Sequence, residues 1–375
     1  MPRWESQMPE AAFIVHLDDY QGFIVKKRHP SSLTLTEKAL NLVFYEHQKG
    51  EKKDITELEA EGMRIASFTM GAYPGWTVGF VLSPDELLEE VRDEISGMGR
   101  FMLELMSQDP DSVDLGEILS SRSSMPTITS EQRCAQIYLT PSTALLLERL
   151  HTEGVESTAK LSLWLKSQVQ TDSVDLVEAI TPLMDSGLVK VELVGKTLET
   201  AFLLKDVFAH RAPPQESYAK ASETVPGIVQ EYMEYVSNFF TPEPPGGGYN
   251  PTLPIDDPNS PILEDREKIS RILSNTIQYE VLKSLRTKPM SVKDISEMTS
   301  FPEAVVQNAL WAMEAERIAA HFEKEDVWAL ITDPRMDVFF PEYILPILTR
   351  KLEEKKINPD TARRYLELLI QTWSE

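Results

Sequence analysis

The hydrophobic residues in the first part of the chain form short apolar segments separated by polar turns. Residues 11–17 (AAFIVHL) are rich in β-branched and aromatic side chains, and a polar turn that ends at Gly22 leads to a second apolar segment at 23–27. Two more segments of this kind follow at 63–70 and 76–83. Short segments bounded by turn residues predict two antiparallel β-hairpins.

Apolar residues with helical spacing lie between the hairpins and after them. Thr34 can cap a helix, with Glu37 three residues later as the second half of a capping box. The charged stretch at 51–61 is expected to be a loop or a short exposed helix. After Pro84 a long helix is predicted, whose apolar stripe consists of Leu87, Leu88, Val91, Ile95, Met98, Phe101, Met102 and Leu105. The order strand, strand, helix, strand, strand, helix predicts an α+β fold, an α/β sandwich over residues 9–108.

Residues 131–212 and 266–335 contain the same order of elements. Each predicts three helical segments followed by two short strands, which is the outline of a winged helix. In the second copy, residues 269–285 predict a single first helix. Three aromatic residues of this copy fall at apolar-periodic positions and are expected in its core: Trp311, Phe322 and Trp328.

The third helices of both copies are acidic. They cover residues 173–187 and 302–316, and neither contains a Lys or Arg. Their acidic residues are Asp175, Glu178 and Asp185 in the first copy and Glu303, Glu314 and Glu316 in the second. Proteins bind DNA largely by neutralising phosphates and read bases mostly with Arg and Lys. Nucleic-acid binding is therefore not expected.

Three segments complete the chain. Residues 225–240 predict a connecting helix, residues 241–265 a Pro- and Gly-rich linker, and residues 336–375 a C-terminal helical hairpin. The hairpin carries the largest basic cluster of the sequence, and its members are the candidate partner-binding residues: Arg350, Lys351, Lys355, Lys356, Arg363 and Arg364. Acidic residues are interspersed with this cluster, so an ion-paired surface is the alternative interpretation.

The composition is that of an acidic globular protein. The chain has 375 residues, 42% of them hydrophobic and 26% charged, with a formal net charge of −23. This length predicts several domains, and the charge disfavours binding to nucleic acids or anionic membranes in general. Cys134 is the only cysteine and no apolar segment is long enough to span a bilayer. We therefore expect a cytoplasmic protein without disulfides.

Sequence motifs for catalysis are not found. The six His residues are scattered, and the chain contains neither a phosphate-binding loop nor a Gly-x-Ser-x-Gly nucleophile motif. No catalytic, cofactor-binding or metal-binding residue is predicted. We expect a protein that is not an enzyme.

The N-terminal segments resemble the longin and roadblock domains, which bind small GTPases and each other. The resemblance rests on the hairpin from Phe13 to Val25 with its Asp-Tyr-Gln-Gly turn, and on residues 76–86 (WTVGFVLSPDE). A longin-like domain followed by winged helices is similar in domain order to the nitrogen permease regulator-like proteins, subunits of a complex that acts on small GTPases. Members of that family can supply an arginine to the GTPase from a loop. Here the corresponding residues 71–75 contain no Arg or Lys, and Arg64 is expected to be structural.

Two functional hypotheses follow. The first is a non-enzymatic interaction scaffold, whose resemblance implies a role in small-GTPase regulation or in a trafficking or signalling complex. Its expected partner is a small GTPase or another longin/roadblock-like domain, and a homo- or heterodimer is an expected form. The alternative is a winged-helix transcriptional regulator whose N-terminal domain senses or dimerises. The acidic third helices favour the first hypothesis.

Overall fold

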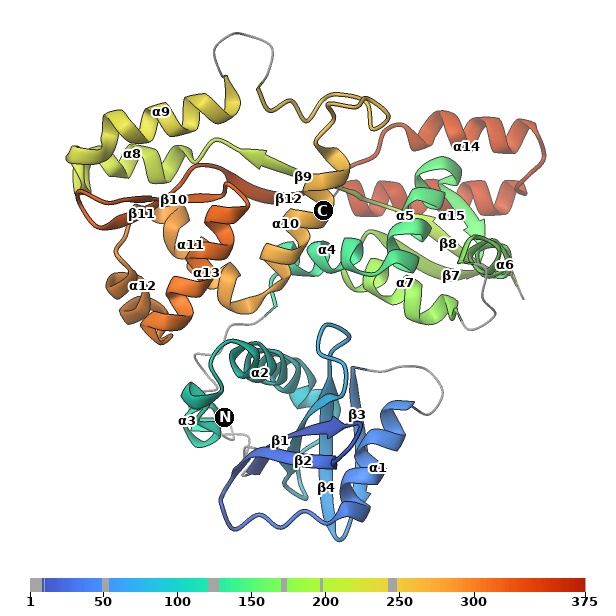
Figure 1. Cartoon of the computed structure of the whole chain (residues 1–375). Coiled ribbons are helices and arrows are strands. Elements are labelled where there is room, and N and C mark those ends of the chain that lie inside the picture. The colour runs from blue at the N-terminus through green and yellow to red at the C-terminus, as the bar shows by residue number, and fades with distance from the viewer. Residues whose placement is uncertain are drawn as a thin grey trace, which may run out of the picture. The chain divides into compact units, whose positions relative to one another are not determined.

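The computed structural model has a mixed α/β architecture (Figure 1). It describes residues 9, 11–48, 54–120, 128–169, 174–195, 198–241 and 248–374. The chain divides into two compact units. The first consists of residues 1–128, 275–284 and 290–312, and the second of residues 129–274, 285–289 and 313–375.

An antiparallel sheet forms the centre of the first unit. Its strands run in the order β2-β1-β5-β4-β3. Their bounds are β1 Ala11–Asp18, β2 Gly22–His29, β3 Ile55–Ala60, β4 Met63–Thr69 and β5 Trp76–Leu82. The four predicted strands are thus confirmed and share one sheet, which leaves β2 and β3 at its two edges.

Strand β3 corrects the expectation of a loop or helix at 51–61, of which residues 51–53 lie outside the described part of the chain. Glu57 and Glu59 are exposed, whereas Ile55 and Ala60, the first and last residues of the strand, are buried. Glu61 and Gly62 both have positive φ, 53° and 80°. Two such residues form the tight turn that matches the twist of a hairpin, so β3 pairs with β4 despite its charge.

Two helices cover opposite faces of this sheet (Figure 1). Helix α1 (Glu37–Gln48) packs Val43 and Phe44 against Phe13, Val15 and Ile65. Side chains alternate along a strand, so Phe68 of β4 points away from α1. There it meets α2 (Leu88–Gln108), where the backbone of Gly99 lies directly against its ring. A short helix, α3 (Leu115–Ser120), follows α2.

Three helices of the second winged-helix sequence contribute to the first unit. They are α11 (Thr276–Thr287), α12 (Val292–Thr299) and α13 (Glu303–Ala315), of which residues 276–284 and 290–312 belong to this unit. Phe301, just before α13, stacks on Phe101 of α2 with ring centroids 5.4 Å apart. The single helix predicted at 269–285 is two helices, because the chain breaks at Asn275 between α10 (Ile262–Ser274) and α11.

The second unit begins with the first winged-helix sequence. Its elements are α4 (Ser130–Leu139), α5 (Pro141–Glu153), β6 (Val155–Ser157), α6 (Thr158–Val169), α7 (Leu176–Asp185), β7 (Val189–Val194) and β8 (Leu198–Leu203). The three helices and two strands predicted here are present, and β6 adds a third strand in the order β6-β8-β7. The sequence did not indicate β6, since it is only three residues long.

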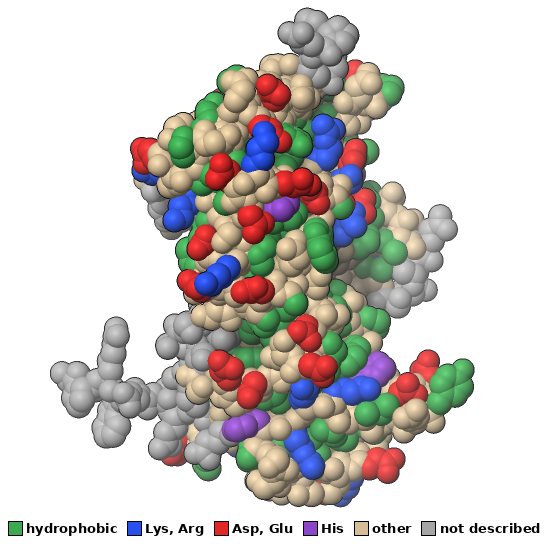
Figure 2. Space-filling model, turned by 60° about the vertical axis from the view of Figure 1, so that its left-hand side comes forward, with side chains coloured by type: hydrophobic (Ala, Val, Ile, Leu, Met, Phe, Trp, Pro, Cys, Tyr) green, Lys and Arg blue, Asp and Glu red, His purple; other side chains and the backbone are tan. Residues whose placement is uncertain are grey.

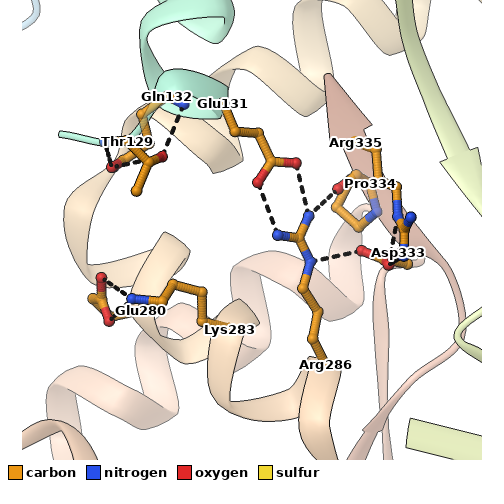
Figure 3. A network of polar contacts seen from close by, with 9 residues as sticks. All are labelled: Thr129, Glu131, Gln132, Glu280, Lys283, Arg286, Asp333, Pro334 and Arg335. Carbon is orange, nitrogen blue, oxygen red and sulfur yellow. Dashed lines mark hydrogen bonds and ion pairs between the residues drawn. The ribbon is translucent and has the colours of Figure 1, made fainter. Parts of the chain in front are cut away.

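A long antiparallel ribbon joins distant parts of the second unit. Strand β9 (Asp206–Ala212) pairs along its whole length with β12 (Asp333–Phe339). The other strands of this unit are β10 (Ala319–Phe322) and β11 (Val327–Leu330). Arg286, in the last turn of α11, donates to both oxygens of Glu131 on α4, to Asp333 at the start of β12 and to the carbonyl of Pro334 (Figure 3). One guanidinium therefore fixes three segments.

Helical hairpins flank the ribbon (Figure 1). Helices α8 (Gln215–Thr224) and α9 (Val229–Phe240) come before the predicted linker, and α14 (Ile344–Glu353) and α15 (Pro359–Trp373) form the predicted C-terminal hairpin. Of the linker, residues 242–247 lie outside the described part of the chain. Tyr249 is anchored: its hydroxyl accepts from the backbone N–H of Arg211 at 2.8 Å and donates to Asp265 at 2.6 Å.

We predict that Gly79→Ala destabilises the first unit by about 1–3 kcal/mol, because a methyl group has no space there. A Cβ at Gly79 would lie 2.1 Å from the ring of Phe13, which is fully buried on the neighbouring strand. Gly71→Ala is the matched control, since a Cβ there meets nothing within 4 Å. Urea denaturation of the full chain measures both. Equal stability of the two variants would contradict this packing.

Candidate interaction surfaces

Helix α7, the third helix of the first winged-helix sequence, exposes a stripe without positive charge. Val177 is 51% exposed and Met184 is 43% exposed, and Thr181 lies between them. The spacing i, i+4, i+7 places the three on one helix face. Glu178 and Asp185 are exposed beside them. Asp175 has a local role, because its carboxylate caps the helix by accepting from the N–H of Val177.

Helix α13, the third helix of the second sequence, has a similar outward face. Trp311 was expected in the core but is 56% exposed, whereas Phe322 and Trp328 are buried as predicted. Ala304 and Asn308 are exposed at the two preceding positions of the same face. Residues on the opposite, inner face of α13, such as Val305, are buried. The sequence could have indicated the exposure of Trp311, because Ala304, Asn308 and Trp311 have the spacing i, i+4, i+7 of one helix face.

The basic cluster of the C-terminal hairpin does not form one exposed patch. Arg350, Lys355, Lys356 and Arg363 are exposed. Lys356 pairs with Glu354, and Arg363 pairs with Asp360. Arg364 forms a two-pronged bond to Glu192 on β7, at 2.8 and 3.1 Å, and also contacts Glu367. The ion-paired interpretation therefore describes Lys356, Arg363 and Arg364.

Lys351 points into the protein. Its side chain is 6% exposed, and its ammonium donates to the carbonyls of Glu153 and Val155 at 3.0 and 2.7 Å. It also pairs with the carboxylate of Glu153 at 2.7 Å. Partial burial alone would raise the pKa of Glu153, but the hydrogen bond and charge of Lys351 lower it. Lys351 joins α14 to the end of α5 and is not available to a partner.

We predict that Lys351→Met lowers the free energy of unfolding by about 2–4 kcal/mol, because it leaves the carbonyls of Glu153 and Val155 without this donor and the carboxylate of Glu153 with Arg149 as its remaining ion-pair partner. Arg350→Met on the same helix removes an exposed charge and is expected to change it by about 0.5 kcal/mol or less. Thermal and urea unfolding compare the two. If Lys351→Met left the free energy of unfolding unchanged, Lys351 would again be a candidate partner-binding residue.

Charges elsewhere are mixed. On the face that Figure 2 shows, Lys and Arg side chains are interspersed with Asp and Glu. The two edges of the first unit's sheet differ: β2 exposes Lys26 and Arg28, and β3 exposes Glu57 and Glu59. Arg64 is structural as expected, because it pairs with Glu57 and donates to the carbonyls of Ser83 and Pro84.

A buried carboxylate lies at the start of α11 in the first unit. Glu104 of α2 is 1% exposed and accepts from the backbone N–H of Thr276 at 2.9 Å. A carboxylate at a helix N-terminus compensates the unpaired N–H groups there. Burial nevertheless raises the pKa of Glu104 to about 7, against the opposing charge of Arg100.

We predict that this carboxyl makes the first unit less stable as the pH rises. Its pKa in the folded protein lies above its ordinary value of 4.5, so folding favours the protonated form. The resulting stabilisation is present below that value and disappears as the pH rises through about 7. Between about pH 5 and about pH 8 the native protein should lose up to about 3 kcal/mol relative to Glu104→Gln, which cannot titrate.

Urea denaturation of both proteins across this pH range measures the effect. Glu90→Gln, an exposed change on the same helix, is the control and should follow the native protein. A difference between native protein and Glu104→Gln that does not change with pH would show that the carboxyl titrates normally.

No group of three or more His, Cys, Asp or Glu side chains among the described residues could hold a metal ion. Cys134 is buried, and burial raises the pKa of its thiol to about 11, so it is a poor nucleophile. None of the helices in the described ranges is long and apolar enough to cross a membrane.

Comparisons of the chain with protein-family models, with curated proteins and with solved structures give no match.

Proposed function

We propose that this chain is a non-enzymatic, cytoplasmic interaction scaffold whose partners are proteins. The observation that carries the proposal is the outward face of α7, where Val177, Thr181 and Met184 are flanked by Glu178 and Asp185. In a DNA-binding winged helix this face enters the major groove. Here it would place two carboxylates and a partly apolar stripe against phosphates.

Apolar side chains on an exposed helix face favour a protein partner. Burial of Val177 or Met184 by a partner would stabilise the complex by about 1–2 kcal/mol for each largely buried side chain. The neighbouring carboxylates would favour a partner with Lys or Arg around its own apolar contact. The same argument applies to Trp311 on α13, since exposed Trp side chains are frequent anchors of protein interfaces.

The first unit supports the more specific form of the proposal. Its resemblance to longin and roadblock domains implies a small GTPase or another such domain as the partner. Both β2 and β3 are edge strands, and an added strand can pair with an open edge. The exposed Lys26 and Arg28 on β2 would favour an acidic partner strand, whereas Glu59 on β3, beside the Glu57 that pairs with Arg64, would favour a basic one.

The proposal predicts that the full-length chain binds no duplex DNA with sequence selectivity, even at low salt, where electrostatic attraction is strongest. A mobility-shift assay with a random-sequence pool measures this. The charge-reversed variant Glu178→Lys/Asp185→Lys serves as the positive control, and we expect it to gain weak, salt-sensitive binding.

A second experiment tests the native chain against purified small GTPases in each nucleotide state, with Lys26→Glu compared with Lys38→Glu on α1.

A selective shift by the native chain that survives competitor DNA would replace the scaffold with the transcriptional regulator. Binding to none of the GTPases by a strictly monomeric chain would remove the GTPase form of the proposal. A loss of binding in Lys26→Glu but not in Lys38→Glu would locate the contact at the β2 edge.

A further inference from the structure

The second half of the chain contains one arrangement of elements twice. In residues 130–240 the order is two helices, a short strand, two helices, three strands and two helices. Residues 262–373 repeat this order, except that a single bridge residue, Met290, takes the place of the short strand. We call these the first and the second repeat. Strands β7, β8 and β9 correspond in order to β10, β11 and β12, and the hairpin α8–α9 corresponds to α14–α15.

Backbone hydrogen bonds at the entrance to the strands also repeat. In the first repeat the N–H of Leu188 donates to the carbonyl of Leu183, and the carbonyl of Leu188 accepts from Leu204 and Lys205. In the second repeat Ile318, Met313, Ile331 and Thr332 make the same three bonds, at 2.8, 2.8 and 3.2 Å. Gly187 and Arg317, the residues just before, both have positive φ. The correspondence therefore extends from the order of elements to individual bonds.

The ribbon between the repeats is symmetric about its centre. Strands β9 and β12 have seven residues each, and the middle residue of one, Ala209, pairs with the middle residue of the other, Met336. The first residue of each strand pairs with the last residue of the other: Asp206 with Phe339, and Asp333 with Ala212. Pairing of equivalent positions with each other is the signature of a two-fold, self-complementary interface.

Equivalent side chains hold the two ends of the ribbon. Asp206 begins β9 and accepts from His151, in the last turn of α5, at 2.7 Å. Asp333 begins β12 and accepts from Arg286, in the last turn of α11, at 2.8 Å. Each repeat thus bonds the aspartate of its third strand to the end of its own second helix.

The hairpins, by contrast, cross over to the other repeat. Ala221, Ile228 and Tyr232 of the first repeat's hairpin pack on Ala320, Phe322, Val327, Ala329 and Ile331 of the second repeat. The second repeat's hairpin returns the contact: Tyr365 donates to the carbonyl of Leu203 at 2.6 Å, and Trp373 donates to that of Leu204 at 3.0 Å. Lys351 and Arg364 bond to Glu153 and Glu192 of the first repeat.

We propose that the repeats form an internal dimer held together by exchanged hairpins, and that the surface each repeat presents to the other also fits a repeat of a second copy of this chain. The chain passes from the first repeat to the second through residues 241–261. A self-complementary interface with exchanged hairpins forms equally well within one chain or between two. Two chains would then pair as an intertwined dimer, first repeat to second repeat in both directions.

The test is a full-length protein in which residues 242–247 are replaced by a site for a specific protease. After cleavage, the two fragments should stay together at the mass of the uncut chain, about 42.5 kDa, and separate only in denaturant. Light scattering after size exclusion measures this. Fragments that separate in native buffer would overturn the proposal.

Variants of the cut protein identify the contacts that keep the two fragments together. Ala209→Asp places a carboxylate at the buried centre of the ribbon and should weaken fragment association by at least about ten-fold. Val338→Asp, at an exposed position of the same ribbon, is the control and should leave it unchanged. Tyr365→Phe removes one hairpin hydrogen bond and should weaken association by about ten-fold. Equal association in all variants would overturn the assignment of the interface.

Refolding tests whether two copies of the chain can pair as an intertwined dimer. Refolding the uncut chain at rising concentration should give a dimer fraction that increases with concentration. Cleaving both chains of an intertwined dimer should halve its mass, because each paired set of repeats then contains one fragment from each chain. A chain that refolds only as a monomer, or a dimer that keeps its mass after cleavage, would overturn this part.

Discussion

The two aspartates that begin β9 and β12 set the main constraint on the second unit. Asp206 and Asp333 are buried, and a buried carboxylate is costly unless charged or polar groups compensate it. His151 and Tyr343 do so for Asp206, and Arg286 and Arg335 do so for Asp333. The compensating groups come from helix ends, from β12 and from the segment before α14. Pairing of the two strands therefore fixes the helices and hairpins around them.

The sequence predicted the elements whose signals are local. The apolar segments of β1, β2, β4 and β5, helices α1 and α2 and the C-terminal hairpin lie where the periodicity placed them. The predicted cap was wrong by two residues, because Thr36 and not Thr34 accepts from the N–H of Ala39 at the start of α1. Strand β3 was missed because its alternation includes Glu57 and Glu59, which belong to an exposed edge. The β9–β12 ribbon was missed for another reason. Its two strands lie more than a hundred residues apart, and the sequence of neither strand indicates which segment it pairs with.

The candidate surfaces show the same division. Charge type is visible in a sequence, and the acidic character of α7 follows directly from it. Burial of a charge is not visible, so Lys351 was grouped with exposed neighbours although it bonds two carbonyls inside the protein. Trp311 shows the reverse case, since a large aromatic at an apolar-periodic position faces outward. In both cases the decisive fact is the partner that the fold supplies, and short-range pattern does not encode it.

The hairpins also bear on what the winged-helix outlines can do. A β-ribbon wing that reaches along DNA needs a free surface, but α8 and α9 bury Ala320, Phe322, Val327 and Ala329 on one face of β10–β11. In the β7–β8 hairpin, Glu192 forms an ion pair with Arg364 from α15. The strand pairs β7–β8 and β10–β11 thus make contacts between the chain's own repeats. What remains outward on α7 is apolar and acidic, and the proposal of a protein partner rests on this face.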